Sequence, residues 1–236
     1  MEDAEGNDKA ITLRAIIGFT GYLFLNPVIL FISAGTVNWG MAWAYFSVSI
    51  FGTIASRVIA NRRNTGLLEE RARYREVDNV KTWDNVLVPI AALLGPVAAI
   101  IVAGLNMRYG WTDLIPLWGQ ILGLLVGIFG FVIAAWAMIE NRFFSAVVRI
   151  QEDRGHTVCN TGPYRFIRHP GYAGGILFYL ITPIVLNAMW AYIPMGISIV
   201  VSVFRTALED NALQNELTGY LEYAEKTRYR LMPGIW

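Results

Sequence analysis

The sequence predicts an all-α fold, a polytopic membrane bundle of about six transmembrane helices that ends in a tight helical hairpin. Of its 236 residues, 55% are hydrophobic and only 16% are charged, which is more apolar surface than a water-soluble domain of this length can bury. The apolar residues form long uninterrupted runs, and about 20 such residues span a bilayer. The cations gather between alternate runs, as they do in membrane proteins.

Six apolar runs carry this prediction. The first is read as a retained helix, because no small-residue cleavage site follows it. Only Asn187 and its neighbours separate the last two runs, which predicts the hairpin. The runs cover residues 11–33, 39–59, 85–105, 117–139, 171–186 and 188–204.

Three glycines in the fourth run, Gly123, Gly127 and Gly130, predict close helix packing rather than a nucleotide-binding loop. The chain reads as a single membrane domain, 1–236. Within it, residues 1–139 form an N-terminal four-helix part, and residues 140–236 form a C-terminal part that binds the cofactor and holds the catalytic groups.

The distribution of cations predicts the orientation. If the N-terminus is internal, the inside segments are 1–14, 57–84, 140–170 and 205–236. These contain every one of the 19 Lys and Arg residues except Arg108. By the positive-inside rule they face the cytosol. A net charge of +1 argues against a nucleic-acid partner, and one cysteine excludes an intrachain disulfide.

Two polar clusters lie next to the hairpin. The loop 155–172 holds both histidines and precedes the fifth run, while Arg205, Glu209 and Asp210 follow the sixth. Because the two helices of a hairpin return to the same side, we expect the clusters to converge there. Arg205 and Glu209 are four residues apart and share one helix face.

Other interpretations of these residues are open. Arg205 and Glu209 are also compatible with an ordinary surface ion pair. Cys159 as a nucleophile lacks an obvious base and positioning group. His156 and His169, even with Cys159, make a poor ligand set for zinc, so no metal site is expected.

Several motifs follow one another in the C-terminal part. They are Gly155-His156-Thr157-Val158, Thr161-Gly162-Pro163-Tyr164, Arg168-His169-Pro170-Gly171-Tyr172-Ala173-Gly174, Arg205 before Glu209-Asp210, and a tail with Gly219-Tyr220, Tyr223, Arg228 and Pro233. In this order and spacing they resemble the signature of the isoprenylcysteine carboxyl methyltransferase family and the related phospholipid methyltransferases. The resemblance covers about residues 140–236, and the four N-terminal runs carry no such signature.

The resemblance implies an S-adenosylmethionine-dependent methyltransferase whose cofactor lies on the cytosolic side without a Rossmann domain. Glu209 would hold the methionine end of the cofactor, and Arg205 would face the acceptor, so these two are the implied catalytic residues. Asp210 stands where the family has a second Glu, and Arg149 where it has an amide. The implied cofactor-binding residues are His156, Thr157, Val158, Cys159, Tyr164, His169, Pro170, Gly171, Tyr172 and Glu209.

These residue types suit the chemistry. An acid and several donors match the charged ends of the methionine moiety, and tyrosine rings can lie near a sulfonium. The expected acceptor is lipophilic or lipid-modified, best a prenylcysteine-type carboxylate, which Arg205 would bind bidentately. Membrane lipids are the other expected partners.

Three alternatives stay open at this point. A phospholipid amine is a second candidate acceptor. Arg205 would then contact the phosphate of the phospholipid and not its amine. A membrane reductase using NADPH is a second class of enzyme, for which Arg149, Arg154, Arg165 and Arg168 would serve the phosphates. A non-catalytic membrane protein with a relic pocket is the third.

Overall fold

The computed structural model describes residues 18, 20–21, 23–64, 79–112 and 114–236, and the regular elements in these ranges are all helical. The predicted helical membrane bundle is confirmed. Of the predicted six spans, four are helices long and apolar enough to cross a membrane among the described residues, and the other two correspond to the shorter apolar helices Leu23–Ala34 and Pro170–Val185. The elements in chain order are a helix at Leu23–Ala34, α2 (Gly40–Arg63), α4 (Asp84–Pro89), the π turn η1 (Ile90–Leu94), α5 (Gly95–Tyr109), α6 (Leu117–Glu140), the 3-10 turns η2 (Glu152–Arg154) and η3 (Gly162–Arg165), α7 (Pro170–Val185), the 3-10 turn η4 (Met189–Ala191), α8 (Tyr192–Glu216) and α9 (Tyr220–Lys226).

Each predicted apolar run coincides with a helix, although the first run begins at residue 11, outside the described residues. The last run was predicted to end at Phe204, but α8 continues to Glu216. The apolar run ends where the charged residues begin, but a helix can continue through charged residues. Residues 205–216 contain neither Gly nor Pro and include the strong helix formers Ala, Leu, Glu and Gln. The extension carries Glu209 and Asp210 on a rigid element.

The predicted hairpin is also confirmed. α7 ends at Val185, Asn187 adopts a left-handed conformation with φ 49°, and the chain returns through η4 into α8. Asn106 on α5 fixes this turn, because its Nδ2 donates to Asn187 O at 2.7 Å. The ends of α7 and α8 that carry polar residues therefore lie at the same end of the molecule.

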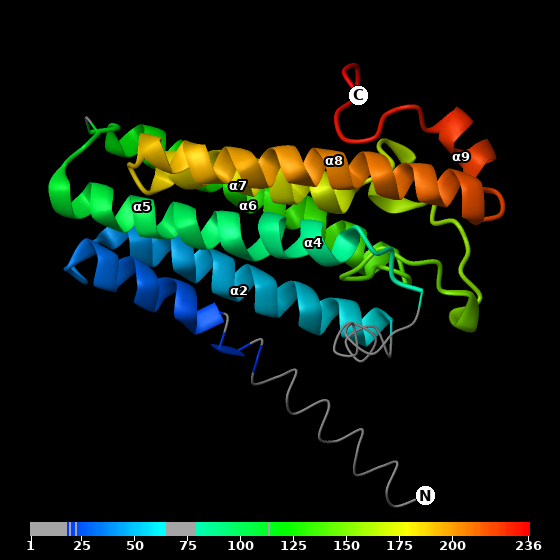
Figure 1. Ribbon diagram of the computed structural model, residues 1–236, viewed down its shortest axis with the longest axis horizontal. Helices are drawn as coiled ribbons and strands as arrows, with labels where there is room; N and C mark the ends of the chain where they lie inside the picture. Colours follow the sequence, from blue (N-terminus) through cyan, green and yellow to red (C-terminus); the bar gives the residue numbers. More distant parts are fainter. Residues whose placement is uncertain (1–17, 19, 22, 65–78, 113) are drawn as a thin grey trace, which may run out of the picture.

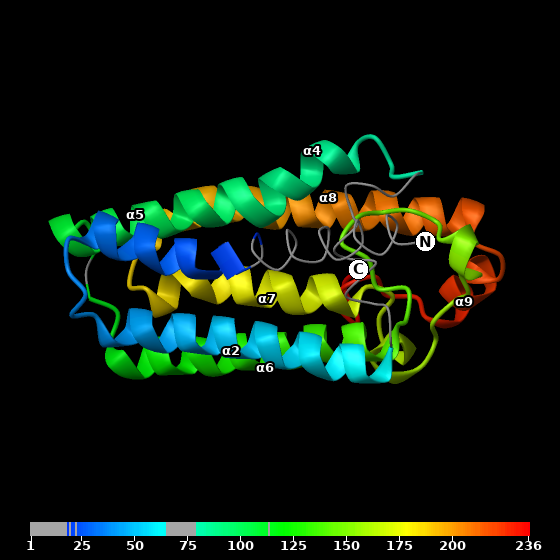
Figure 2. The ribbon, with the colours of Figure 1, turned by 90° about the horizontal axis from the view of Figure 1, so that it is seen from below.

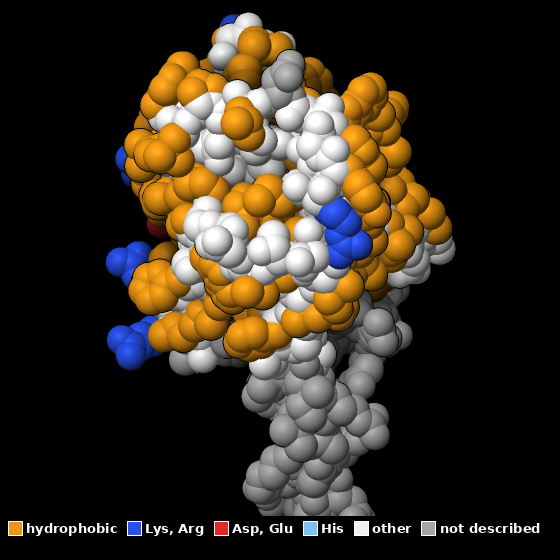
Figure 3. All heavy atoms as spheres, turned by 90° about the vertical axis from the view of Figure 1, so that its left-hand side faces the viewer, with side chains coloured by type: hydrophobic (Ala, Val, Ile, Leu, Met, Phe, Trp, Pro, Cys, Tyr) orange, Lys and Arg blue, Asp and Glu red, His pale blue; other side chains and the backbone are white. Residues whose placement is uncertain are grey.

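The helices lie side by side along the long axis, and the connecting segments are divided between its two ends (Figures 1 and 2). The turns 35–39, 110–112 and 186–191 lie at one end, whose surface is mostly hydrophobic or uncharged (Figure 3). The segments 79–83, 141–169 and 217–236 lie at the other end. The described segments predicted to face the same side of the membrane thus gather together. We call this the polar end.

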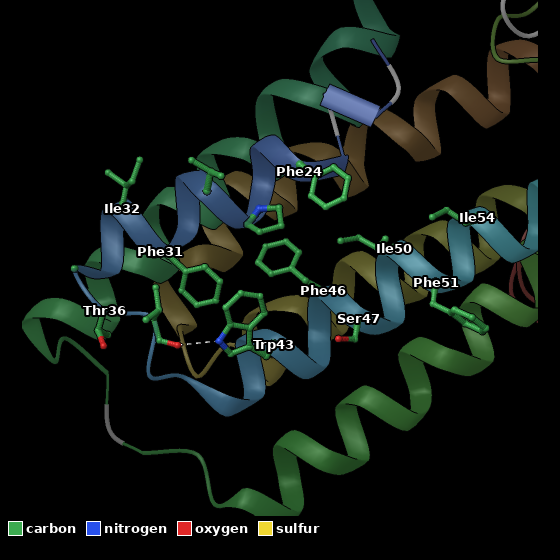
Figure 4. Close-up of a pocket in the computed structure, with 14 residues that line it drawn as sticks. Phe24, Phe31, Ile32, Thr36, Trp43, Phe46, Ser47, Ile50, Phe51 and Ile54 are labelled. Carbon is green, nitrogen blue, oxygen red and sulfur yellow. Dashed lines mark hydrogen bonds between the residues drawn. The ribbon is translucent and has the colours of Figure 1, made fainter. Parts of the chain in front are cut away.

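An apolar groove of about 1120 Å³ lies between the helix Leu23–Ala34 and α2 (Figure 4). Phe31, Trp43 and Phe46 point toward one another in it, and the rings of Phe31 and Trp43 are 4.6 Å apart. The Trp43 indole donates to Val37 O at 2.8 Å. Among the described residues that line the groove, none is charged.

The glycines of α6 do pack closely, as predicted. An added Cβ at Gly127 would lie 2.9 Å from Ile181, and one at Gly130 would lie 2.7 Å from Gly174 O. The contact is reciprocal, since a Cβ at Gly174 would come within 2.3 Å of Gly130 O. Because both obstacles are backbone atoms, the helices would have to separate to admit a methyl group. This contact fixes α7, and with it Tyr172, against α6.

We therefore predict that Gly174→Ala destabilises the protein by about 1–3 kcal/mol, the usual cost of overpacking. Gly175→Ala is the matched control, because a Cβ at this neighbouring position of α7 meets nothing within 4 Å. Thermal unfolding in detergent measures both variants. A midpoint for Gly174→Ala equal to that of Gly175→Ala would contradict the close contact.

Candidate active site

The Asp210 carboxylate is the most heavily contacted polar group of the polar end. Asp210 lies on α8 with none of its surface exposed. Its partners come from the start of α7, from α8 itself, from α9 and from the C-terminal segment. They are Arg168 Nε at 3.0 Å, His169 Nε2 at 3.1 Å, Gln214 Nε2 at 2.6 Å, Tyr220 OH at 3.1 Å and Arg230 Nε at 2.8 Å.

Backbone hydrogen bonds join the same segments. The N–H groups of Arg168 and His169 donate to Tyr229 O and Arg230 O, both at 2.9 Å. The C-terminal segment therefore runs alongside the residues that lead into α7, and Pro170 begins that helix without needing a backbone partner. His169 is held at two points, because its backbone N–H donates to Arg230 O and its ring contacts Asp210.

A second polar group lies next to the first. It consists of Tyr172, about one turn after His169 on α7, and of Arg205 and Glu209 on α8. The Tyr172 hydroxyl donates to Glu209 Oε2 at 2.6 Å. The Arg205 guanidinium carbon lies 5.2 Å from the centre of the Tyr172 ring, within the range of a cation–π contact. Both residues of α8 thus contact one tyrosine, which confirms that Arg205 and Glu209 share a face of the helix.

The charge partner of Arg205 is Asp84, the first residue of α4. Arg205 Nε lies 2.5 Å from Asp84 Oδ1, and Nη2 lies 3.0 Å from Asp84 Oδ2. Arg205 Nη2 also donates to Ala146 O at 3.0 Å. The Asp84 side chain is wholly buried and that of Arg205 is 15% exposed. The interpretation of Arg205 and Glu209 as a surface ion pair is therefore wrong, because Arg205 belongs to a buried pair across two helices.

Sequence reasoning missed Asp84. Its only signal was an acidic residue at the start of an apolar run, which is equally typical of a helix N-terminus. In the structure it also accepts the N–H of Val148 at 2.7 Å, so it fixes the segment that follows α6.

A cluster of buried aromatic side chains receives three of the predicted cofactor residues. Tyr164 packs there with Val158 and Cys159, against Tyr220 and Tyr223 of α9. Burial raises the pKa of the Tyr164 hydroxyl well above its usual range, and it donates to Ala137 O at 3.4 Å.

The Cys159 thiol is not activated. Burial raises its pKa, and Sγ lies 3.9 Å from the backbone oxygen of Glu140. A thiol that is harder to ionise is a weaker nucleophile, so Cys159 is better interpreted as a small side chain packed against the aromatic cluster.

His156 lies in a third group. Its ring is 4.5 Å from that of Phe143, and its Nδ1 accepts the Gln151 N–H at 3.3 Å. Burial, followed by the charges of Arg149, Arg154 and Arg142, lowers the pKa of His156 to about 4. The ring is therefore neutral near pH 7 with its proton on Nε2, which makes it a donor for a ligand.

The structure thus divides the predicted site residues. Tyr172 meets Glu209 and Arg205, whereas His169 meets Asp210. Pro170 begins α7, and the neighbour of Gly171 is Phe144. Val158, Cys159 and Tyr164 lie together in the aromatic cluster. His156 stands on the Phe143 ring and is joined to neither group by a hydrogen bond in the described part of the chain, while Thr157 is exposed. The same part of the chain contains no group of three His, Cys, Asp or Glu arranged to hold a metal ion.

A polar cavity of about 450 Å³ opens beside the aromatic cluster. The segment that contains Val158 forms one wall and α9 forms the other. The lining residues are Val158, Asn160, Arg165, Thr218, Gly219, Glu222, Tyr223, Lys226 and Thr227. A void next to Val158 and Tyr223 is the kind of space that a planar ligand group can enter.

Fold and site together define a helical membrane protein whose buried polar side chains gather at the polar end of α7 and α8. Residues 121–215 match the isoprenylcysteine carboxyl methyltransferase (ICMT) family. This stretch runs from α6 through most of α8 and includes every predicted site residue. The family resemblance found in the sequence is therefore confirmed for this part of the chain.

Two proteins described as probable protein-S-isoprenylcysteine O-methyltransferases are similar to the chain, one from Oryza sativa subsp. indica and one from subsp. japonica. Each is 36% identical over 66 residues, which are 28% of this chain and 35% of the relative. The matched segment thus spans about a third of the length of these relatives.

The depressed pKa of His156 predicts a dependence of stability on pH. Between pH 6.5, its ordinary pKa, and about pH 4, the unfolded chain binds a proton that the folded chain does not. The free energy of unfolding should therefore fall as the pH is lowered through this window. In His156→Gln, which cannot titrate, the loss of thermal stability between about pH 7 and about pH 5 should be smaller. An equal loss in both proteins would contradict the buried, neutral imidazole.

Proposed function

We propose that this protein is an integral-membrane methyltransferase that transfers a methyl group from S-adenosylmethionine to the carboxylate of a prenylcysteine-type acceptor. The observation that carries the proposal is the match to the ICMT family over residues 121–215, the stretch that holds Tyr172, Arg205 and Glu209 together. The comparisons favour neither the phospholipid amine nor the reductase.

The donor set fits S-adenosylmethionine. Glu209 is partly buried. Within the described residues only its Oε2 accepts a hydrogen bond, from Tyr172, so its charge remains available to an ammonium group. Nε2–H of the neutral His156 is a donor for a carboxylate, and the arginines beside it add positive charge. The cavity beside Val158 offers room for a ring system.

When bound, S-adenosylmethionine supplies an electrophilic methyl group on a cationic sulfonium. The acceptor oxygen would take this methyl group by direct displacement, and the electron pair of the carbon–sulfur bond would remain on sulfur. A carboxylate acceptor is already deprotonated, so the protein needs no general base. Its contribution is to orient the reactants and exclude water. In our proposal Glu209 fixes the cofactor, Tyr172 holds Glu209, and Arg205 binds the acceptor.

A methyl-transfer assay tests this function. Protein in phospholipid vesicles should transfer radiolabelled methyl from S-adenosylmethionine to N-acetylated farnesylcysteine. It should not modify the same compound supplied as its methyl ester, in which the carboxylate is blocked. If the label appears only in phosphatidylethanolamine, the acceptor is the phospholipid amine and not a prenylcysteine. If calorimetry detects NADPH binding and no S-adenosylmethionine binding, the protein is a reductase.

We further propose that the polar end faces the cytosol, because the described Lys and Arg residues, Arg108 excepted, all lie in segments that the sequence predicts to be internal. Exposed positions allow a labelling test in a Cys159→Ala background. Cysteines at Glu152 and Glu225, both exposed at the polar end, should be protected from a membrane-impermeant thiol reagent in intact cells. A cysteine at Leu114, which is 86% exposed at the opposite end, should react. Labelling of positions 152 and 225 from outside would reverse the orientation.

A further inference from the structure

Arg205 has most of its hydrogen-bonding capacity already committed. Its Nε–H faces Asp84 Oδ1, and its Nη2 contacts both Asp84 Oδ2 and Ala146 O. Nε carries one proton and Nη2 carries two, so this edge of the guanidinium is saturated. Within the described part of the chain no hydrogen bond is made by Nη1. A ligand can therefore meet Arg205 only through Nη1, which replaces the bidentate contact expected from the sequence.

The Asp84 carboxylate is itself held rigidly. It is fully buried, it begins α4, and Oδ2 accepts the N–H of Val148. The carboxylate is thus held by the Val148 N–H through Oδ2 and by Arg205 through both oxygens. An arginine side chain has several rotatable bonds and loses considerable rotamer entropy when it is ordered. Asp84 provides that ordering before any ligand arrives.

The position that Asp84 imposes on Arg205 is the one that matters for the candidate site. The guanidinium carbon lies 5.2 Å from the Tyr172 ring, whose hydroxyl donates to Glu209 at 2.6 Å. A chain of contacts therefore leads from Asp84 through Arg205 to Tyr172 and Glu209. A displaced guanidinium would disturb the acceptor contact and the contact between Arg205 and the Tyr172 ring.

We propose that Asp84 is a positioning residue of the active site, which holds Arg205 so that only Nη1 addresses the acceptor carboxylate. This inference rests on the proposed function. Asp84 also balances the charge of Arg205. An acceptor carboxylate becomes a neutral ester in the reaction, so a strong ground-state ion pair would hold the substrate without lowering the barrier. A charge-balanced Arg205 that contacts through one nitrogen avoids such uniform binding.

Two substitutions of Asp84 separate positioning from charge balance. Asp84→Asn keeps the shape and removes the charge, whereas Asp84→Glu keeps the charge and displaces the carboxylate by one methylene. Lys81→Ala is the matched control. Lys81 lies three residues before Asp84 and also pairs with α8, through Glu216 at 2.6 Å, but its side chain is 28% exposed and lies outside the candidate site.

We expect kcat for methyl transfer to fall about tenfold or more in both Asp84 variants, the scale that small misplacements of reacting groups produce. The acceptor KM should not rise in Asp84→Asn, because Arg205 keeps its charge. The Kd of S-adenosylmethionine, measured by calorimetry, should stay unchanged in Asp84→Glu, which keeps the charge that balances Arg205. In Glu209→Gln that Kd should rise roughly ten- to hundredfold, through loss of a charged hydrogen bond. Lys81→Ala should match the wild type in all three quantities.

The outcomes distinguish the possible roles. Wild-type kcat in both Asp84 variants, with only the thermal midpoint lowered, would make the pair structural and overturn the proposal. A rise in KM at unchanged kcat would also overturn it. If Asp84→Asn does not fold, Asp84→Glu decides alone, since it retains the buried charge pair. Wild-type protein that binds S-adenosylmethionine but methylates no prenylcysteine would refute the proposed acceptor, a result separate from the comparison of the variants.

Discussion

The polar end of this protein depends on one buried carboxylate. Asp210 has no exposed surface and contacts two arginines, a histidine, a tyrosine and a glutamine, which come from four segments of the chain. Removing a carboxylate from water costs several kcal/mol unless charged and hydrogen-bonding partners replace the water. The partners of Asp210 do so only when the start of α7, α9 and the C-terminal segment are all docked. The cost of burying one charge therefore makes their docking cooperative.

Glu209 and Asp210 are adjacent in sequence but serve opposite surfaces. Successive residues of an α-helix are turned by about 100°, because 3.6 residues complete a turn. Asp210 thereby faces the C-terminal segment and α9, whereas Glu209 faces Tyr172 on α7. One acid is saturated by protein groups, and the other has a single described hydrogen bond. A paired acid motif can thus combine a structural anchor with a ligand-binding group without any insertion in the helix.

The sequence predicted what depends on local pattern. Apolar runs located the helices, Asn187 marked the hairpin turn, and spacing placed Arg205 and Glu209 on one face. It did not predict that α8 extends to Glu216, because hydropathy indicates which residues suit the membrane and not where a helix ends. The partner of Arg205 was also beyond reach. Asp84 is 121 residues away, and no periodicity connects two helices that meet only in the folded protein.

The loop that carries His156 shows a different limit. The motif identified its residues as chemically special, but a loop has no period from which the direction of a side chain can be derived. In the structure His156 stands on Phe143 among three arginines, while Tyr164 turns inward to the aromatic cluster. Whether both contact the cofactor, as the resemblance implies, stays a prediction that ligand binding must decide.

The N-terminal helices carry no family signature, yet one of their residues shapes the charge of the candidate site. Asp84 lies outside the matched stretch 121–215 and neutralises Arg205 from α4. Of Asp84, Arg205 and Glu209, only Glu209 then keeps an uncompensated charge, and that charge is negative. In a partly buried place an uncompensated anion attracts a cation strongly, because little water screens it. The arrangement therefore suits the positive methionine end of S-adenosylmethionine. It also explains why a partly buried site tolerates two acids beside one arginine, since the second acid is balanced only when a cationic ligand is present.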